Sequence, residues 1–355
     1  MNTSTDQSVV QTPTLTSLSH GGGCGCKIAP GVLSELLASM PATRAYANLM
    51  VGTETADDAA VYLLNDQQAL IATTDFFMPV VDDPFDFGRI AATNALSDVY
   101  AMGGTPILAL AIVGMPINVL PAKVIGEILR GGQSVCEAAG IPIAGGHSID
   151  SIEPIYGLVA LGLAHPDRIR RNSDVQIGDR LVLTKPLGVG IFSAAFKKQQ
   201  LDDKGYEAMI RSTTQLNCVG AELARLASVH AMTDVTGFGL LGHSHEMARA
   251  AGVSIRIHQA SVPLLDGVLG LAASGMVTGA SGRNWASYGA HVTGISQENT
   301  LWRALLTDPQ TSGGLLVSCR ADAVDEVLAI ARARGNAQAA VIGEVVAGNG
   351  TVDVV

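Results

Sequence analysis

Basic residues are scarce in this chain. Its 355 residues include 22 Lys and Arg against 32 Asp and Glu, which gives a formal net charge of −10. Proteins that hold nucleic acid through phosphate contacts carry basic stripes or patches. No such stripe occurs here, so we expect no nucleic-acid partner. A small polyanionic substrate would need metal ions to approach so acidic a chain.

Long apolar runs are also missing. The longest, residues 107–114, is far shorter than the roughly 20 residues that span a bilayer. We therefore expect a soluble protein without a membrane partner. Residues 1–17 contain no Lys or Arg and no apolar core, so they fit neither a secretory signal nor a transit peptide. We expect them to form a disordered tail.

Cysteine is sparse and odd in number, with five residues in the whole chain. This does not suggest a disulfide framework, and free thiols fit a reducing cytoplasm. We expect Cys136, Cys218 and Cys319 to be small buried hydrophobic residues. The other two cysteines lie in residues 19–27 (SHGGGCGCK), a segment that we call the arm.

The arm has the composition of a flexible, reactive loop. Its four glycines let the backbone wrap closely around a substrate, although ordering the loop costs conformational entropy. We expect Lys27 to favour the thiolate, which is the nucleophilic form of cysteine. Cys24 has glycine on both sides and is the better nucleophile candidate, whereas Cys26 is a candidate helper or resolving thiol. The alternative is a Gly-rich tether with incidental cysteines.

Length and pattern predict two domains of α+β type. Hydrophobic residues make up 48% of a chain with 40 glycines, which is typical of a compact, loop-rich protein. A polar segment at residues 165–179 marks the boundary, so we expect the units 1–50 (tail and arm), 51–166 and 167–355. The expected strands are residues 59–64, 69–74, 106–115, 141–144, 154–164, 181–184, 253–257, 314–318 and 340–345. The expected helices are residues 30–37, 87–102, 121–139 and 321–334.

Several common nucleotide and metal motifs are absent or misleading. No G-x-x-x-x-G-K-[ST] occurs, which excludes a P-loop. Gly237, Gly239 and Gly242 match G-x-G-x-x-G, but the preceding strand is short and polar and no clear βαβ unit follows. The pair His243 and His245 lacks a third ligand and is interpreted as structural. Residues 145–148 (GGHS) are expected to form a turn whose N–H groups approach an anion.

Four aspartates stand at expected element ends or turns: Asp58, Asp75, Asp98 and Asp234. Each alone would more often be a cap or turn residue. As a set they offer only oxygen ligands, which favour Mg²⁺ or Mn²⁺ and suit phosphoryl transfer. Asn94 precedes Asp98 by four residues in an expected helix, so both polar groups lie on one face.

Seven segments in this order resemble selenophosphate synthetases, also called selenide, water dikinases. They are residues 19–27, 57–61, 73–77, 92–98, 145–150, 233–242 and 308–314. The resemblance implies a two-domain architecture like that of aminoimidazole ribonucleotide synthetase, with mixed sheets, helices packed on one face and a Gly-rich N-terminal arm. It also implies a homodimer paired through the N-terminal sheets, with ATP bound between them.

The resemblance implies a reaction and a set of site residues. ATP, hydrogen selenide and water would give selenophosphate, AMP and orthophosphate, and selenophosphate would be the selenium donor for selenocysteine and selenouridine. The implied helper ions are several Mg²⁺ and K⁺. The implied roles are Cys24 and Lys27 in catalysis, Asp58, Asp75, Asp98 and Asp234 as metal ligands, and Lys27, Thr55, Ala56, Asp57, Asp75, Asp98, Gly146, His147 and Ser148 in nucleotide binding.

Two further readings of the sequence stay open, as does the route by which selenium arrives. One is a kinase or ligase of the same ATP-binding superfamily that acts on a carbonyl oxygen. The other is a selenium or metal carrier that binds through Cys24 and Cys26 without chemistry. Selenium would arrive either as free selenide or from a delivery protein.

Overall fold

The computed structural model describes residues 13–39, 46–296 and 298–355, and these form two mixed β-sheets with their helices. Residues 1–12 of the expected tail lie outside this description. The remainder of that segment contains a 3₁₀ helix, η1 (Leu15–Leu18), whose Leu15 is buried. Within the described residues, no helix combines the length and hydropathy needed to cross a bilayer.

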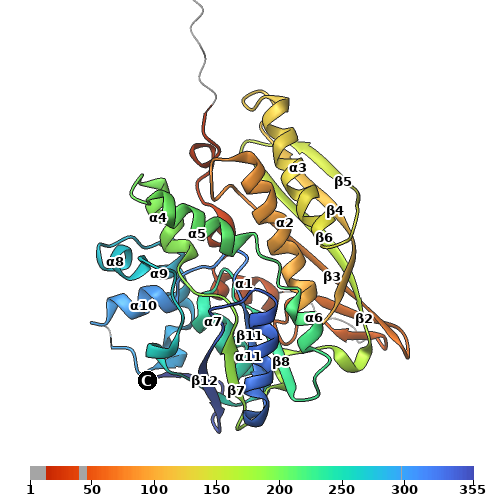
Figure 1. Cartoon of the computed structure of the whole chain (residues 1–355), viewed down its shortest axis with the longest axis vertical. Coiled ribbons are helices and arrows are strands. Elements are labelled where there is room, and N and C mark those ends of the chain that lie inside the picture. The colour runs from red at the N-terminus through yellow and green to blue at the C-terminus, as the bar shows by residue number, and fades with distance from the viewer. Residues whose placement is uncertain (1–12, 40–45, 297) are drawn as a thin grey trace, which may run out of the picture.

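The first sheet has six strands in the order β1-β2-β3-β6-β4-β5, and only β4 and β5 pair in parallel. The strands are β1 (Leu49–Val51), β2 (Ala60–Asn65), β3 (Gln68–Phe77), β4 (Thr105–Met115), β5 (Ile143–Asp150) and β6 (Ile155–Ala164). Helices α2 (Pro84–Ala101) and α3 (Ala122–Ala138) cover one face (Figure 1). Side chains alternate across the strands, so Ala69, Ile71 and Phe77 of β3 are buried against these helices.

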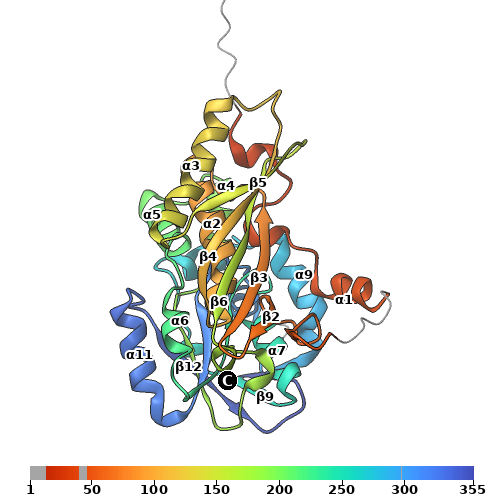
Figure 2. The same cartoon turned by 90° about the vertical axis from the view of Figure 1, so that its right-hand side faces the viewer.

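The opposite face of this sheet is apolar and open. Tyr62, Leu64, Phe76 and Ile107 are between 40% and 49% exposed there, and Figure 2 shows this face turned toward the viewer. Exposed apolar side chains gathered on one face are a common feature of interaction sites.

The second sheet has seven strands in the order β10-β13-β9-β12-β7-β11-β8. They are β7 (Arg180–Leu183), β8 (Val229–Asp234), β9 (Ser254–Ile257), β10 (Val292–Thr293), β11 (Leu315–Cys319), β12 (Ala340–Val346) and β13 (Val352–Val354). Alternate residues of β7 join two different cores, since Leu181 and Leu183 pack with α7 (Gly239–Ala251) and Val182 packs with α11 (Val324–Ala333). This sheet therefore carries helices on both faces.

Other helices surround these layers. They are α1 (Pro30–Ala38), α4 (Val189–Lys197), α5 (Asp203–Thr213), α6 (Val219–Leu223), α8 (Val268–Ala273), α9 (Gly279–Tyr288) and α10 (Thr300–Leu306). Helix α2 is buried along most of its length and connects the two halves, where Asn217 donates to Ser97 Oγ at 2.8 Å. It starts at Pro84 because the Asp83 side chain accepts a hydrogen bond from the Asp86 N–H.

Two local expectations are wrong. Residues 145–148 form no turn but lie in strand β5, because their backbone pairs in register with β4. Glycine pairs favour turns locally, and this long-range pairing overrides the preference. Cys218 is exposed rather than buried, since it directly precedes α6 at the surface, whereas Cys136 and Cys319 are buried as expected.

Candidate active site

The arm lies closed against both halves of the molecule. Its central part forms a short 3₁₀ helix, η2 (Gly23–Cys26). The Gly23 N–H donates to Met78 O at 2.9 Å, next to the first sheet. The Cys24 N–H donates to Thr311 Oγ1 at 3.1 Å, in the loop before β11. The expected flexible segment therefore has a defined seat in which Cys24 is only 1% exposed.

Glycine is required where the arm touches the second half. Gly23 has a φ of +55°, and a Cβ there would lie 2.3 Å from Thr311 Oγ1. A Cβ on Gly237 would lie 2.7 Å from Cys24 O and 3.0 Å from Lys27 Cδ. A side chain at either position would clash, so both glycines let the backbone segments approach closely.

Asn94 organises the polar groups around the thiol. Its Oδ1 accepts from Cys24 Sγ at 3.1 Å and from the Ser312 N–H at 2.7 Å, and its Nδ2 donates to Asp75. Asp75 in turn lies 3.5 Å from Lys27 Nζ. Asn94 thus fixes the thiol and the Lys27–Asp75 ion pair relative to each other.

The protonation state of Cys24 differs from our expectation. Burial raises the pKa of its thiol well above 9.0, and the neighbouring Asp75 carboxylate raises it further. Lys27 does lower this pKa, as predicted, but the effect is smaller than that of burial. With the arm closed, Cys24 is therefore a neutral thiol at pH 7, consistent with its role as donor to Asn94.

A cavity of about 600 Å³ lies beside the arm and collects most of the expected site. Lys27 reaches it from the arm. Six acidic residues of the described structure line it, and three of them are predicted metal ligands: Asp58 before β2, Asp98 in α2 and Asp234 at the end of β8. Asp75 is not among its lining residues and is held instead by Lys27 and Asn94. Three of the four predicted aspartates thus converge from both halves of the chain.

These carboxylates are buried and poorly compensated. Burial raises the pKa of Asp58 and Asp98 well above 3.8, with Asp234 as the next cause for each, and burial also raises the pKa of Asp234. Thr233 donates to Asp58 Oδ1 at 2.8 Å and Thr73 donates to Asp98. Oδ2 of Asp58 and Oδ2 of Asp234 are buried without a hydrogen-bond partner within the described structure.

Such a donor set fits divalent cations. Buried carboxylate oxygens without partners are stabilised by a bound cation, and oxygen ligands suit Mg²⁺. Among the described residues, no three Asp, Glu, His or Cys side chains form a ready-made cage. Mg²⁺ commonly binds through one or two carboxylates plus substrate phosphates. We therefore expect the ligands of each ion to be shared between the protein and its substrate.

The other predicted nucleotide contacts fall into two groups. Ala56 and Asp57 line the cavity, and Thr55 donates to Asp57 beside it. Asn172 N–H also donates to Asp57 Oδ1 at 2.6 Å. Gly146, His147 and Ser148 do not line this cavity, because they lie on exposed edge strand β5. One chain alone does not bring the two groups together.

Sequence reasoning missed several polar lining residues, among them Glu54, His243 and Glu246. His243 is 6% exposed and lines the cavity, with Nδ1 at 3.0 Å from Glu246 Oε2 and Nε2 at 3.3 Å from Thr236 Oγ1. The sequence pattern favours a structural role for it and for His245, and His245 stacks on His291 and does not line the cavity. The spacing of His243 from Asp234 across a Gly-rich helix entry was the available signal.

Family models match both halves of the chain. The N-terminal domain of AIR synthase related proteins matches residues 56–164, and the C-terminal domain of the same proteins matches residues 176–355. The selenide, water dikinase of Burkholderia ambifaria (strain MC40-6) is 67% identical over 342 residues, covering 96% of this chain and 97% of that protein. The chain belongs to the selenide, water dikinase family.

More distant members of the family agree over the same length. The selenide, water dikinase of Rhizobium meliloti (strain 1021) is 58% identical over 344 residues, covering 97% of this chain and 98% of that protein. Among solved structures, a thiamine-monophosphate kinase from Stenotrophomonas maltophilia K279a has a TM-score of 0.63 at 19% identity, over 87% of this chain and 91% of that one. The hydrogenase maturation protein HypE in complex with ATP has a TM-score of 0.62 at 17% identity, over 84% and 85%. These likenesses confirm the α+β, AIR synthase-like fold of this dikinase family member.

Proposed function

We propose that this selenide, water dikinase uses Cys24 and Lys27 beside the carboxylate cavity to make selenophosphate. ATP, hydrogen selenide and water are consumed, and AMP and orthophosphate leave with the product. In the first step selenium attacks the γ-phosphorus, forming the Se–P bond as the bond to the ADP oxygen breaks. In the second step water cleaves ADP to AMP and orthophosphate. The single observation that carries this proposal is the seating of Cys24 and Lys27 against Asn94 and Asp75 at the edge of the cavity.

Lys27 is suited to stabilise the phosphoryl group while it is transferred. Burial lowers its pKa, but Asp75 and further anionic neighbours raise it more, so the net pKa is well above 10.5 and the ammonium stays charged. A preorganised cation stabilises the charge that develops in phosphoryl transfer. Leu33, Leu37 and Leu49 line the same cavity and offer apolar contact to the adenine base.

We propose Asp58, Asp98 and Asp234 as Mg²⁺ ligands, with Asp75 recruited as a further one, and K⁺ as helper ion. Bound Mg²⁺ would neutralise the phosphates. It would also offset the negative charge of the carboxylates, which raise one another's pKa. The protein's own contribution is to hold the nucleotide between both halves. The closed arm excludes water while selenium reacts and retains ADP for the second step.

The reaction itself can be tested by phosphorus NMR. Anaerobic incubation with ATP, Mg²⁺ and selenide should give a selenium-coupled phosphorus signal, with AMP in equal yield. ADP as the final nucleotide, or turnover that does not require selenide, would point instead to a kinase of the same fold. Absence of ATP hydrolysis under every condition would indicate a carrier.

We propose that the chain works as a homodimer joined through the open face of the first sheet. Tyr62, Leu64, Phe76 and Ile107 give this face its apolar character. Pairing there would cover that surface. It would also bring the edge strand β5 close to the other subunit, so that His147 could approach the nucleotide bound by that subunit. This supports a shared site because the strand lies away from the cavity of its own chain.

The dimer proposal predicts the effect of a charge on that face. Ile107→Asp should convert a dimer into a monomer of 36.6 kDa in light scattering, because an aspartate cannot be desolvated in an apolar interface without large cost. Ile177→Asp is the matched control, since Ile177 is 63% exposed but precedes β7 in the other half. A monomeric parent, or an Ile107→Asp variant that stays dimeric, would contradict this interface.

Three further proposals follow from the sequence. The domain limits are 51–166 and 167–355 after the arm, in line with one sheet in each apart from the start of β1 at Leu49. The location is cytoplasmic, supported by five cysteines that are all free. A delivery protein would supply selenium to Cys24, which it could reach only with the arm open.

A further inference from the structure

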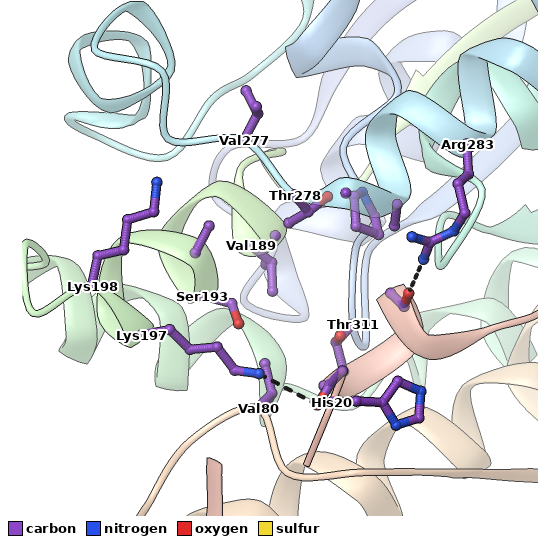
Figure 3. A pocket seen from close by; sticks show the side chains of 18 residues that line it. His20, Val80, Val189, Ser193, Lys197, Lys198, Val277, Thr278, Arg283 and Thr311 are labelled. Carbon is purple, nitrogen blue, oxygen red and sulfur yellow. Dashed lines mark hydrogen bonds between the residues drawn. The ribbon is translucent and has the colours of Figure 1, made fainter. Parts of the chain in front are cut away.

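A separate cavity of about 330 Å³ lies against the arm and shares no lining residue with the cavity of the carboxylates. Figure 3 shows its side chains. The arm contributes the backbone of Gly21, Gly22 and Gly25. The second half contributes Lys197 at the end of α4 and Arg283 from α9, whose first residues also line the cavity.

The charge of this cavity is opposite to that of the chain. Lys197, Lys198 and Arg283 line it, and no acidic side chain does so among the described residues. His20 also lines it but is paired with Glu153 at 2.9 Å. In a protein with a net charge of −10 this concentration of cations marks a place for an anion.

The remaining lining groups favour oxygen-rich anions. Hydroxyl groups come from Ser193, Thr278 and Thr311, and the ten-residue helix α9 presents its N-terminus to the cavity. Guanidinium, ammonium and hydroxyl donors around a helix N-terminus match the acceptor oxygens of a phosphate group. The selenide anion has no oxygen atoms to accept this set of hydrogen bonds.

Two of the cations also hold the arm. Lys197 Nζ donates to Gly21 O at 3.4 Å, and Arg283 Nη2 donates to Gly25 O at 3.0 Å (Figure 3). Both acceptors are neutral carbonyls. The lysine and arginine donors are already charged in these bonds, and a phosphate would add the attraction between opposite charges, so it would compete for these two side chains. Occupation of the cavity and closure of the arm are therefore opposed.

We propose that this cavity binds a phosphate-type dianion, and that binding withdraws Lys197 and Arg283 from the arm and releases it. The inference deepens the proposed function, on which it rests. That reaction produces two such anions, orthophosphate and selenophosphate, while the arm encloses Cys24. An anion that opens the arm links the end of each turnover to the exposure of the thiol for the next.

Phosphate binding is the first test. Calorimetry with inorganic phosphate, on full-length protein saturated with Mg²⁺ and a non-hydrolysable ATP analogue, should show one phosphate per chain outside the filled nucleotide cavity. Lys197→Gln and Arg283→Gln should each weaken binding by about tenfold or more, because each removes a charged donor. Lys204→Gln, on exposed α5, should leave it unchanged. Thiophosphate that binds tighter than phosphate would assign the site to selenophosphate, and the reverse order to orthophosphate.

Release of the arm is the second test. Alkylation of Cys24, followed by peptide mass spectrometry without nucleotide or selenide, should accelerate severalfold when phosphate is added. In the Arg283→Gln variant, Cys24 should be alkylated faster than in the parent even when no phosphate is added. The phosphate site would be overturned if no phosphate bound, or if neither Lys197→Gln nor Arg283→Gln weakened its binding. The release of the arm would be overturned if phosphate bound without accelerating the alkylation of Cys24. Neither assay contains selenide, so their failure is separate from a failure of selenophosphate synthesis.

Discussion

Cys24→Ser is expected to reduce selenophosphate formation by at least about a thousandfold while leaving Mg²⁺–nucleotide binding nearly intact. A serine hydroxyl is far less ionised than a thiol and handles selenium poorly. The replacement retains the hydrogen bonds to Asn94 and Thr311 that seat the arm, so the fold around it should persist. Phosphorus NMR of the product and calorimetry of nucleotide binding measure the two effects.

Cys218→Ser is the control for this variant. Cys218 is exposed and lies away from both cavities, so its replacement should retain full activity. If Cys24→Ser made selenophosphate at the rate of the parent, the arm would have no chemical role and Cys24 would be dispensable.

Asp234→Asn should have two opposite effects, a loss of activity and a gain of stability. Asp234 is 1% exposed, its Oδ2 has no partner within the described structure, and burial raises the pKa of its carboxyl above 3.8. Neutralising it removes a buried charge, which should stabilise the metal-free protein by about 1–3 kcal/mol at pH 7. Activity should fall by about a hundredfold or more, because a proposed metal ligand is lost.

The pH dependence follows from the same shift. A carboxyl whose pKa is raised by folding favours the folded state when protonated, so the parent loses stability as the pH rises from about 3.8 through the raised value. Asp234→Asn lacks this loss. The difference in melting temperature between the two, measured without metal, should therefore vanish in acid and grow toward neutral pH.

Asp66→Asn is the matched control, since Asp66 is exposed in the turn between β2 and β3. It should change neither melting temperature nor activity. Mg²⁺ with nucleotide should stabilise the parent and this control but hardly stabilise Asp234→Asn. A variant that Mg²⁺ and nucleotide stabilise as much as the parent would remove Asp234 from the metal site.

Much of the fold was predictable from local patterns. The helices at residues 30–37, 87–102 and 121–139 appear within a few residues as α1, α2 and α3, because apolar spacing and proline or glycine at the ends are local signals. The convergence of Asp58, Asp98 and Asp234 was also predicted, from residue type and the family resemblance together.

What the sequence did not reveal depends on contacts between distant segments. The burial of Cys24, which outweighs the effect of Lys27 on the thiol pKa, arises only when Thr311 and Asn94 meet the arm. Strand β5 replaced an expected turn because β4 pairs with it. His243 resembled a surface residue until the packing of α7 placed it in the cavity. Local periodicity carries no information on such pairings.

Consecutive residues of the arm are anchored to different halves of the molecule, Gly23 to Met78 and Cys24 to Thr311. The arm therefore bridges the two halves of the molecule. A hinge motion that separated these two anchors would displace the backbone of Cys24. A change in the angle between the halves would therefore also change the surroundings of the Cys24 thiol.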